Sequence, residues 1–284
     1  MTPLRQQMIE AMQQRGFSKR THQTYLYAVH DLARYYRRSP DQLNVDELQG
    51  YFKHLAIERK LAGASCRLYL NAVRFLYLKV LDWPNFDIPM VVPKRAQRIP
   101  ELLTRAEVMQ IIKACSHPKH WMLLTLCYGT GLRVSEVVAV RVRHIDGERH
   151  LLRIEQGKGA KDRAVILSPS LLDSLRRYWQ RYRPADWFFP NQHHPEFHLS
   201  ITTAQKVFGR AKRQSGVIKV GGIHSLRHAY ATHQLEDGLP INQLQQLLGH
   251  GDLRSTLHYL HWVPTACRGD GGHADLIDAL AGHE

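Results

Sequence analysis

Hydrophobic positions in the first 81 residues recur every three or four residues, with polar positions between them. This spacing is that of an amphipathic helix, and it predicts helices over residues 4–15, 19–36, 45–59 and 64–81. Ser18, a favoured N-cap residue, stands immediately before the second helix. Because no alternating strand pattern interrupts these segments, we expect an all-helical N-terminal domain over residues 1–82.

The second of these helices is expected to have two kinds of surface. Its large apolar and aromatic residues recur at helical spacing and are expected in the core: Tyr25, Val29, Leu32 and Tyr36. Basic residues gather near its ends: Lys19, Arg20, Arg34, Arg37 and Arg38. These ends are therefore candidates for contact with phosphate groups.

The segment DWPNFDIPMVVPKRAQRIP, residues 82–100, contains four prolines. Proline has no backbone N–H to donate, so a segment this rich in proline forms no regular helix. We therefore expect a basic, proline-rich linker over residues 83–100, of a kind suited to lie along nucleic acid.

The rest of the chain mixes helix and strand patterns. A capping box opens a helix at Thr104, and the apolar run 120–142 is broken by a Gly-Thr-Gly sequence that leaves Arg133 at the break. The segment LLRIEQGKGAKDRAVIL, residues 151–167, predicts a β-hairpin whose turn presents Lys158. We expect a mixed α+β domain with a small antiparallel sheet over residues 101–284, in a chain that is mainly α.

The segment GGIHSLRHAYATHQLED, residues 221–237, predicts a helix that begins near His224. His224 and Arg227 are three residues apart, so both can project from the first turn, where free backbone N–H groups also favour an anion. His228 and Tyr230 are expected to be packing or surface residues, and His233 lies too far along the helix to join that first turn.

The stretch LGHGDLRSTLHYL, residues 248–260, sets a histidine and a tyrosine nine residues apart. In one unbroken helix Tyr259 would lie about 180° around the axis from His250 and about 13.5 Å along it, so the two could not share a site. The glycines on both sides of His250 instead favour a helix end and a turn. We expect a second helix to begin at Asp252.

On that second helix the apolar residues form one stripe, expected to face the core: Leu253, Thr256, Leu257 and Leu260. Tyr259 falls beside this stripe and not at its centre. A free tyrosine has a pKa of about 10, so a nucleophilic role near neutral pH requires cations or a proton acceptor around it. Taken alone, Tyr259 fits a packing role better than a chemical one.

Charge indicates the kind of partner. The 284 residues include 39 lysines and arginines against 25 acids, which gives a formal net charge of +14 and a pI near 9.8. This balance favours a polyanion such as nucleic acid, although a solvated basic surface would give the same count. The four cysteines show no CxxC spacing, and there is no signal peptide or long apolar run. We therefore expect a reduced, soluble, cytoplasmic protein without membrane contact.

Eighteen histidines raise the question of a metal site. The adjacent pair His193 and His194 stands in a proline-containing segment without the spacing of HExxH or of a Cys/His finger. A surface loop is the better interpretation of that segment.

Six side chains share a chemical logic. They are donors or cations plus one phenol: Arg133, Lys158, His224, Arg227, His250 and Tyr259. No group of acids accompanies them, as a two-metal nuclease would require. A cationic pocket would stabilise the added negative charge of a phosphodiester transition state and favour ionisation of a phenol nucleophile. For Arg133 the structural alternative is an ion pair with Glu136, three residues on.

These motifs resemble those of the tyrosine recombinase (phage integrase) family. They are TGLRVSE around Arg133, GKGAKDR around Lys158, HSLRH from His224, LGH ending at His250, and Tyr259 nine residues later. The resemblance covers nearly the whole chain, and five motifs in this order are highly specific. It implies that the N-terminal helices form a SAM-like core-binding domain, and that two domains clamp double-stranded DNA from opposite sides.

The resemblance also implies a role for each residue. Tyr259 would attack the scissile phosphate and form a 3′-phosphotyrosyl link, releasing a 5′-hydroxyl. Arg133 and Arg227 would hold the non-bridging oxygens.

Lys158 would protonate the leaving oxygen, while His224 and His250 would assist proton transfer and orient the phosphate. No metal, cofactor or ATP would be required. In the family, chains that are monomeric or dimeric in solution assemble on DNA as a homo-tetramer. The tetramer exchanges strands between two sites through a Holliday junction, in the prokaryotic cytoplasm at the nucleoid.

Two departures from the family pattern stand near the tyrosine and at the C-terminus. His258 and His261 occupy positions where many relatives have an aliphatic residue and a Thr-His pair. The tail, residues 263–284, is glycine-rich and then weakly helical, and the resemblance implies that it docks on a neighbouring protomer. The alternatives are a topoisomerase that reseals its own break, a catalytically silent DNA-binding relative and, more remotely, a His-rich metal protein.

Overall fold

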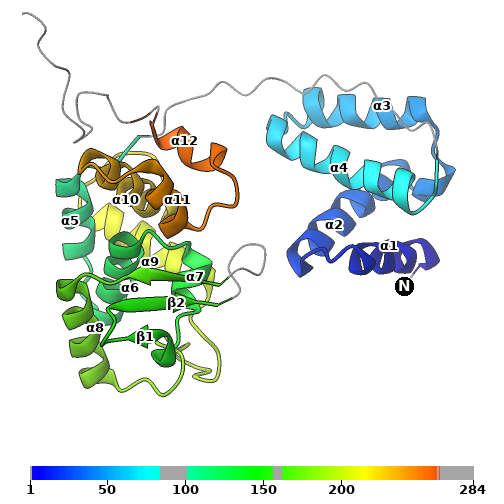
Figure 1. Ribbon diagram of the computed structural model, residues 1–284. Coiled ribbons are helices and arrows are strands. Elements are labelled where there is room, and N and C mark those ends of the chain that lie inside the picture. Colours follow the sequence, from blue (N-terminus) through cyan, green and yellow to red (C-terminus); the bar gives the residue numbers. More distant parts are fainter. Residues whose placement is uncertain (1, 84–100, 156–161, 261, 263–284) are drawn as a thin grey trace, which may run out of the picture. The chain divides into compact units, whose positions relative to one another are not determined.

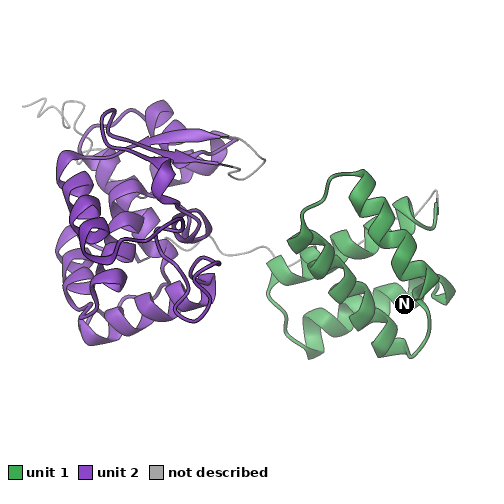
Figure 2. Cartoon of the chain, turned by 90° about the horizontal axis from the view of Figure 1, so that it is seen from below, with its two compact units in different colours: residues 1–98 green, residues 99–284 purple. Residues whose placement is uncertain are grey.

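The computed structural model describes residues 2–83, 101–155, 162–260 and 262. The chain divides into two compact units, residues 1–98 and 99–284 (Figure 2). The predicted linker, the hairpin turn with Lys158, His261 and the C-terminal tail lie outside the described residues, apart from Trp83. Within the described part, no helix combines the length and the apolarity needed to cross a membrane.

The described part of the first unit is entirely helical. Its elements are α1 (Pro3–Gln14), α2 (Lys19–Tyr36), η1 (Pro40–Gln42), α3 (Val45–Lys53), η2 (His54–Glu58) and α4 (Gly63–Lys79) (Figure 1). The four predicted helices are confirmed, although the last turn of the third is the separate π-helical turn η2. Ser18 caps α2 as expected, because its hydroxyl accepts a hydrogen bond from the backbone N–H of Thr21 at 3.2 Å.

Helices α2 and α4 pack together at the centre of this unit. Leu32 is fully buried, and Tyr25, Val29 and Tyr36 lie partly buried against the same core, so the predicted apolar face of α2 is confirmed. The Tyr36 hydroxyl donates to the backbone oxygen of Glu47 at 2.5 Å and so ties the end of α2 to α3.

A single carboxylate, that of Asp31, is buried in this helical core. It accepts hydrogen bonds from the hydroxyls of Tyr51 at 3.0 Å and Tyr69 at 3.3 Å, and it pairs with Arg34 and Arg59. Burial alone would raise the pKa of Asp31, but these donors outweigh it and hold the pKa below its ordinary value. Asp31 thus connects α2 with α3, with α4 and with the residue that follows η2.

The second unit combines helices with a small sheet. Its elements are α5 (Arg105–Lys113), α6 (Pro118–Thr130), α7 (Val134–Val138), η3 (Val142–His144), β1 (Ile145–Asp146), β2 (Leu151–Ile154), β3 (Arg163–Ile166), α8 (Pro169–Tyr182), α9 (Ile201–Gln214), α10 (His224–Glu236), α11 (Ile241–Leu248) and α12 (Arg254–Leu260). Helix α6 is its centre, packed against α5, α8, α9 and α10 (Figure 1). The predicted capping box closes as expected, with Thr104 and Glu107 each accepting from the other's backbone N–H.

The three strands form an antiparallel sheet in the order β1-β2-β3. Leu152 pairs with Val165 and Ile154 with Arg163, so β2 and β3 form the predicted hairpin. Leu152, Ile154 and Val165 are buried, while Arg153 between them is exposed, as period-2 alternation requires. The fold class is therefore confirmed as mainly α, with an all-helical first unit and a mixed second unit.

The prediction for the last helix needs correction. The helix α12 begins at Arg254, and Asp252 precedes it by two residues, where its carboxylate accepts from the Arg254 N–H at 3.0 Å. The predicted core stripe is half right: Thr256 is buried and Leu260 packs against the core. Leu253 and Leu257, however, are 40% and 36% exposed, whereas Tyr259 is 3% exposed.

Polarity explains this orientation of α12. Its inner face meets an apolar cluster that includes Leu244 and Leu248 of α11, and it also meets histidine side chains of α10 and of the turn after α11. Two residues that carry a hydroxyl therefore turn inward. Thr256 and Tyr259 each contact one of those histidines through a hydroxyl. A rule based on hydrophobic periodicity alone therefore misplaces Tyr259 and the two exposed leucines.

Replacing Asp31 with Asn should lower the stability of the first unit by about 2 kcal/mol near neutral pH, because hydrogen bonds to a charged group are lost. Because the pKa of Asp31 is lower in the folded state than in the unfolded state, its carboxylate stabilises the fold at pH values above the unfolded pKa. That stabilisation is lost as the pH falls, so the difference in stability between the two proteins should shrink below about pH 4. Hydrogen exchange at α2 amides of the full chain measures this. Glu10→Gln, at an exposed acid of α1, should change little, and an equal effect there would contradict the prediction.

Candidate active site

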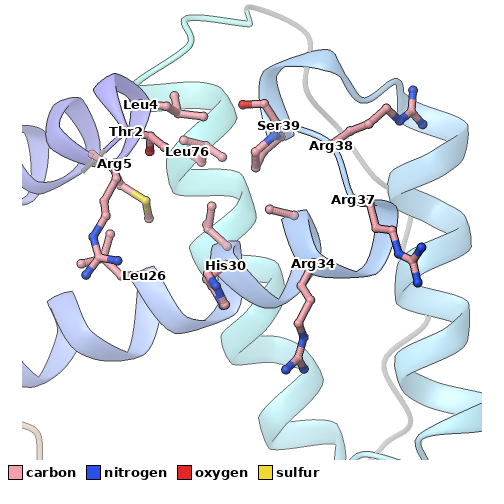
Figure 3. Close-up of a pocket in the computed structure, with 14 residues that line it drawn as sticks. Thr2, Leu4, Arg5, Leu26, His30, Arg34, Arg37, Arg38, Ser39 and Leu76 are labelled. Carbon is pink, nitrogen blue, oxygen red and sulfur yellow. The ribbon is translucent and has the colours of Figure 1, made fainter.

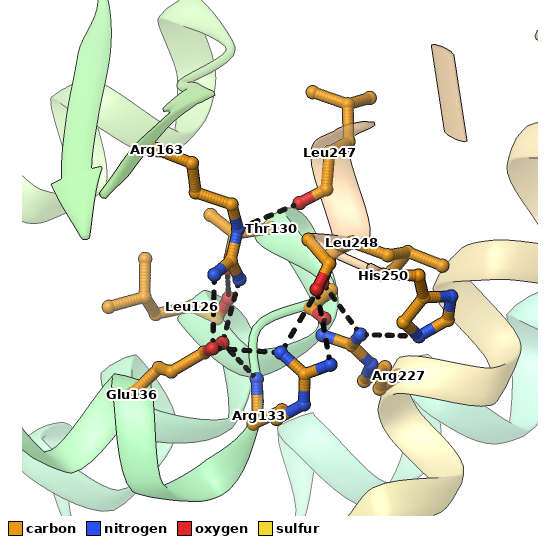
Figure 4. Close-up of polar contacts among 11 residues, drawn as sticks. Leu126, Thr130, Arg133, Glu136, Arg163, Arg227, Leu247, Leu248 and His250 are labelled. Atoms are coloured by element: carbon orange, nitrogen blue, oxygen red, sulfur yellow. Dashed lines mark hydrogen bonds and ion pairs between the residues drawn. The ribbon is translucent and has the colours of Figure 1, made fainter. Parts of the chain in front are cut away.

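Three arginines converge on the C-terminal end of α11 (Figure 4). The last carbonyls of a helix have no partner within the helix and carry the negative end of its dipole. Arg227 donates to Leu248 O at 2.8 Å, Arg163 to Leu247 O at 3.3 Å, and Arg133 more weakly to Leu248 O at 3.5 Å. These three guanidinium groups come from α10, β3 and the start of α7.

Arg133 stands at the break between α6 and α7, as predicted. Its guanidinium donates to Glu136 at 2.9 Å, and its backbone N–H donates to the other carboxylate oxygen at 2.9 Å. The anticipated ion pair with Glu136 therefore exists. It does not conceal the arginine, whose side chain is 22% exposed.

Arg163 was not predicted as part of the site. It makes a two-pronged ion pair with Glu136, with N···O distances of 3.0 Å and 2.8 Å, and its side chain is only 12% exposed. Burial would raise the pKa of Glu136, but the hydrogen bonds from Arg163 and Arg133 outweigh it and lower that pKa. One carboxylate therefore holds two arginines, and it joins α7 to the β2–β3 hairpin.

Arg227 is the most buried of the three, with 2% of its surface exposed. It donates to Gly131 O at 2.7 Å and to Leu248 O at 2.8 Å, the carbonyls that end α6 and α11. Burial and the nearby positive charge of Arg133 lower its pKa to about 10, so it remains charged at neutral pH. This burial of a cation is possible because helix-end carbonyls surround it.

His250 has a defined tautomer in this arrangement. Arg227 can only donate, so the contact of 2.9 Å between its Nη2 and His250 Nε2 makes Nε2 the acceptor. The hydrogen must then sit on Nδ1, which donates to the Thr256 hydroxyl at 2.9 Å. The turn at Gly249, with a positive φ of 62°, brings His250 back toward α10 as the sequence predicts.

Tyr259 is buried next to His250. Its ring is parallel to that of His250 at a centroid distance of 6.3 Å, and its hydroxyl is 3.2 Å from His228 Nδ1. Burial raises the pKa of Tyr259, while the positive charges of Arg227 and Arg133 and a hydrogen bond from Arg227 oppose that rise. The phenol is therefore neutral at rest, with cations beside its oxygen.

A second histidine, His224, lies one turn before His228 on α10. The rings of His224 and His228 are 4.7 Å apart. Desolvation by the surrounding protein and the positive charges of Arg227 and Arg133 lower the pKa of His224, whose side chain is at the exposed rim. The expectation that His228 only packs or faces solvent missed its contact with Tyr259; its position one turn after His224 was the available signal.

The comparisons with known proteins agree with this geometry. Residues 101–265 match the model of the phage integrase family, and residues 4–85 match the model of the phage integrase N-terminal SAM-like domain. This chain belongs to the phage integrase family. It is a tyrosine recombinase, and such enzymes cleave and rejoin DNA.

Two curated relatives illustrate the similarity. A putative integrase/recombinase, y4qK, of Sinorhizobium fredii is 41% identical over 264 residues, which cover 92% of this chain and 84% of the relative. The tyrosine recombinase XerA of Thermococcus kodakarensis is 30% identical over 271 residues, covering 94% of this chain and 93% of the relative.

Solved structures share the fold at low sequence identity. A lambda integrase dimer bound to a core site has a TM-score of 0.72 at 19% identity, covering 89% of this chain and 95% of that one. The Tn1549 transposon integrase in complex with transposon right end DNA has a TM-score of 0.72 at 16% identity, covering 99% of this chain and 98% of that one.

Five of the six predicted site residues of the recombinase thus lie close together, and Lys158 lies outside the described residues. His193 and His194 are exposed on the loop after Pro190, where the sequence predicts a surface segment. In the described part of the chain, no group of three or more His, Cys, Asp or Glu side chains is placed to hold a metal ion.

The first unit of the recombinase has a pocket of its own, between α1, α2, η1 and α4 (Figure 3). Leu4, Leu26 and Leu76 are among the apolar residues that line it. Basic side chains stand along its margin: Arg5, Arg34, Arg37 and Arg38. Arg34 and Arg38 pair with acids, and no ion pair of Arg37 is found among the described residues.

Gly131 should tolerate no side chain. Its φ is +62°, and a Cβ there would lie 2.2 Å from the ring of Tyr230, which is buried. Gly131→Ala should cost about 1–2 kcal/mol for the backbone conformation, plus about 1–3 kcal/mol for the overlap, and should weaken the Arg227 contact.

Gly216→Ala is the matched control, since Gly216 has a φ of +76° but no atom within 4 Å of the added Cβ. It should show only the backbone cost, as measured by the melting of the second unit. Equal losses in the two variants would contradict the steric argument.

Proposed function

We propose that this chain is a site-specific recombinase that cuts and rejoins double-stranded DNA through a 3′-phosphotyrosyl intermediate at Tyr259. The observation that carries the proposal is the position of the Tyr259 phenol, which is buried beside His228 and His250 and close to the positive charges of Arg227 and Arg133. A phenol oxygen beside fixed cations is suited to attack a phosphodiester, because those cations stabilise the negative charge that develops on the non-bridging phosphate oxygens.

Arg133 and Arg227 would hold the non-bridging oxygens. Their guanidinium groups are already fixed by carbonyl and carboxylate oxygens of the protein, so they need not reorganise when the phosphate arrives. Arginine suits this task because its planar fork can donate two parallel hydrogen bonds to a phosphate.

The other three residues would move protons and orient the phosphate. Lys158 is proposed to protonate the leaving 5′-oxygen, and His224 and His250 are proposed to assist proton transfer and to orient the phosphate. The 5′-hydroxyl of a second strand then attacks the phosphotyrosine and restores a phosphodiester, so bond energy is conserved. The mechanism needs no metal, cofactor or ATP, and a pocket of cations would repel a metal ion.

Strand exchange requires more than one copy of the chain. We propose a homo-tetramer that joins two DNA sites through a Holliday junction, with residues 1–82 and 101–284 clamping the duplex and residues 83–100 linking them. The tail, 263–284, would dock on a neighbouring protomer, and the assembly would act at the nucleoid in the cytoplasm. Support comes from the charge of +14 and from relatives whose solved structures contain DNA.

Tyr259→Phe should abolish the covalent adduct with DNA while leaving DNA affinity nearly unchanged, because only the attacking oxygen is removed. The assay incubates the protein with a library of nicked duplexes and isolates SDS-resistant adducts, whose sequences identify the site. Tyr128→Phe, which removes a hydroxyl that contacts His233, should keep the adduct.

Two outcomes would contradict the proposal. An adduct formed by Tyr259→Phe would show that another residue is the nucleophile. Loss of the adduct on adding a chelator would contradict the metal-free mechanism.

Arg37 should contact a DNA phosphate, because it is exposed at the end of α2 and pairs with no acid in the described part of the chain. Arg37→Gln should weaken binding to all sequences alike and reduce the slope of log affinity against log salt by about 0.9. Arg37→Lys keeps the charge and should preserve that slope. Fluorescence anisotropy across a salt series measures this, and an unchanged slope in the glutamine variant would remove Arg37 from the interface.

A further inference from the structure

We propose that His228 is a further catalytic residue: it accepts the phenol proton as Tyr259 attacks the phosphate and returns it when the strand is rejoined. This inference rests on the proposed function, in which Tyr259 is the nucleophile. It assigns a role in proton transfer to a residue outside the six that the motifs indicate.

The geometry places an acceptor at the phenol oxygen. His228 Nδ1 lies 3.2 Å from Tyr259 Oη, within reach of a hydrogen bond. The imidazole is enclosed by aromatic rings, with the His224 ring at 4.7 Å and the Trp262 ring at 5.5 Å between centroids. Trp262 also packs edge-on against Tyr259 at 5.2 Å, so the pair is held together on two sides.

The other groups around the phenol are poorly suited to take its proton. Both ring nitrogens of His250 are already engaged, one by Arg227 and the other by Thr256. Arg227 stays protonated at neutral pH, so it can stabilise a phenoxide but cannot accept a proton. Within the described residues, no hydrogen bond joins His224 to the phenol.

The protonation state of His228 fits this role. Burial, then the positive charges that His224 and Arg227 can carry, lower its pKa to about 4, so the ring is neutral near pH 7. With its hydrogen on Nε2, the Nδ1 lone pair faces the phenol. A bound phosphodiester would add a negative charge nearby and raise the basicity of the ring during the reaction.

The step balances without an outside reagent. The phenol O–H bond breaks as the Nδ1–H bond forms, and the electron pair left on oxygen forms the new O–P bond. The P–O5′ bond breaks, and the leaving oxygen takes its proton from Lys158. In the reverse direction the phenoxide leaves phosphorus and recovers its proton from the His228 imidazolium.

The chain contains a matched control on the same helix. His233 Nδ1 contacts the hydroxyl of Tyr128 at 2.9 Å, the same pairing of a histidine and a tyrosine as that of His228 and Tyr259. His233 has no place in the proposed chemistry. A variant there tests what the loss of a partly buried His–Tyr hydrogen bond does by itself.

The test measures the rate of adduct formation by the full-length protein on a nicked duplex that carries its site. His228→Asn places an amide oxygen near the position of Nδ1, so it can still accept a hydrogen bond but cannot take the proton. It should lower the rate by about 10²-fold or more. His233→Asn should leave the rate close to that of the unaltered protein.

Two readouts separate proton transfer from a structural role. In His228→Asn the rate should rise up to tenfold per pH unit from pH 6 to 8, because the phenol must ionise to solvent. The unaltered protein should show no such rise, because its acceptor is neutral throughout that range.

The second readout uses DNA with sulfur in place of the bridging 5′-oxygen. On this substrate Lys158→Ala should recover its rate, because a thiolate leaving group needs no acid, whereas His228→Asn should not recover.

Failure of the inference differs from failure of the proposed function. If the unaltered protein forms an adduct and His228→Asn matches its rate, or recovers on the sulfur substrate, His228 is not the acceptor. His228→Gln provides a second variant should the first unfold. If the adduct persists in Tyr259→Phe, the assignment of the nucleophile is wrong, and the inference fails with it.

Discussion

The site depends on one interaction, between the free carbonyls at the end of α11 and the guanidinium groups that collect on them. Leu247 O and Leu248 O receive donors from three elements, while Gly131 O at the end of α6 fixes the other side of Arg227. Both helices end at a glycine with a φ of +62°, which turns the chain away and leaves those carbonyls open. Helix ends thus provide the acceptors that permit a cluster of cations inside a folded unit.

Glu136 limits the repulsion within that cluster. It is the carboxylate that binds both Arg133 and Arg163, and its lowered pKa keeps it ionised across the range in which a recombinase works. Because Arg163 begins the strand β3, the same carboxylate fixes the hairpin whose turn contains Lys158 relative to Arg133. The charges are held by the protein before DNA arrives, so little reorganisation is left for the reaction itself.

Local signals predicted the helices well, because capping by Ser18 and Thr104 and the 3.6-residue period depend only on neighbours in sequence. The structure also brings together Arg227, His250 and Tyr259, which the order of the motifs had singled out. Arg163 escaped prediction because its acceptor, Leu247 O, is 84 residues away in sequence. The inner face of α12 was predicted only in part, because hydrophobic periodicity takes no account of hydroxyl contacts, and Thr256 and Tyr259 each meet a histidine.

The burial of Tyr259 explains why a neutral acceptor suits this site better than a phenoxide formed in advance. Burial raises the pKa of the phenol and nearby arginines only partly oppose it, so ionisation at rest is unfavourable. An arriving phosphodiester is itself an anion, and it would discourage ionisation further while drawing on the same arginines. Loss of the phenol proton therefore costs least free energy while the phenol oxygen is forming its bond to phosphorus. At that stage the negative charge moves onto the phosphate oxygens that the arginines hold. A neutral imidazole at hydrogen-bonding distance permits that timing, since it receives the proton only as the charge leaves the phenol.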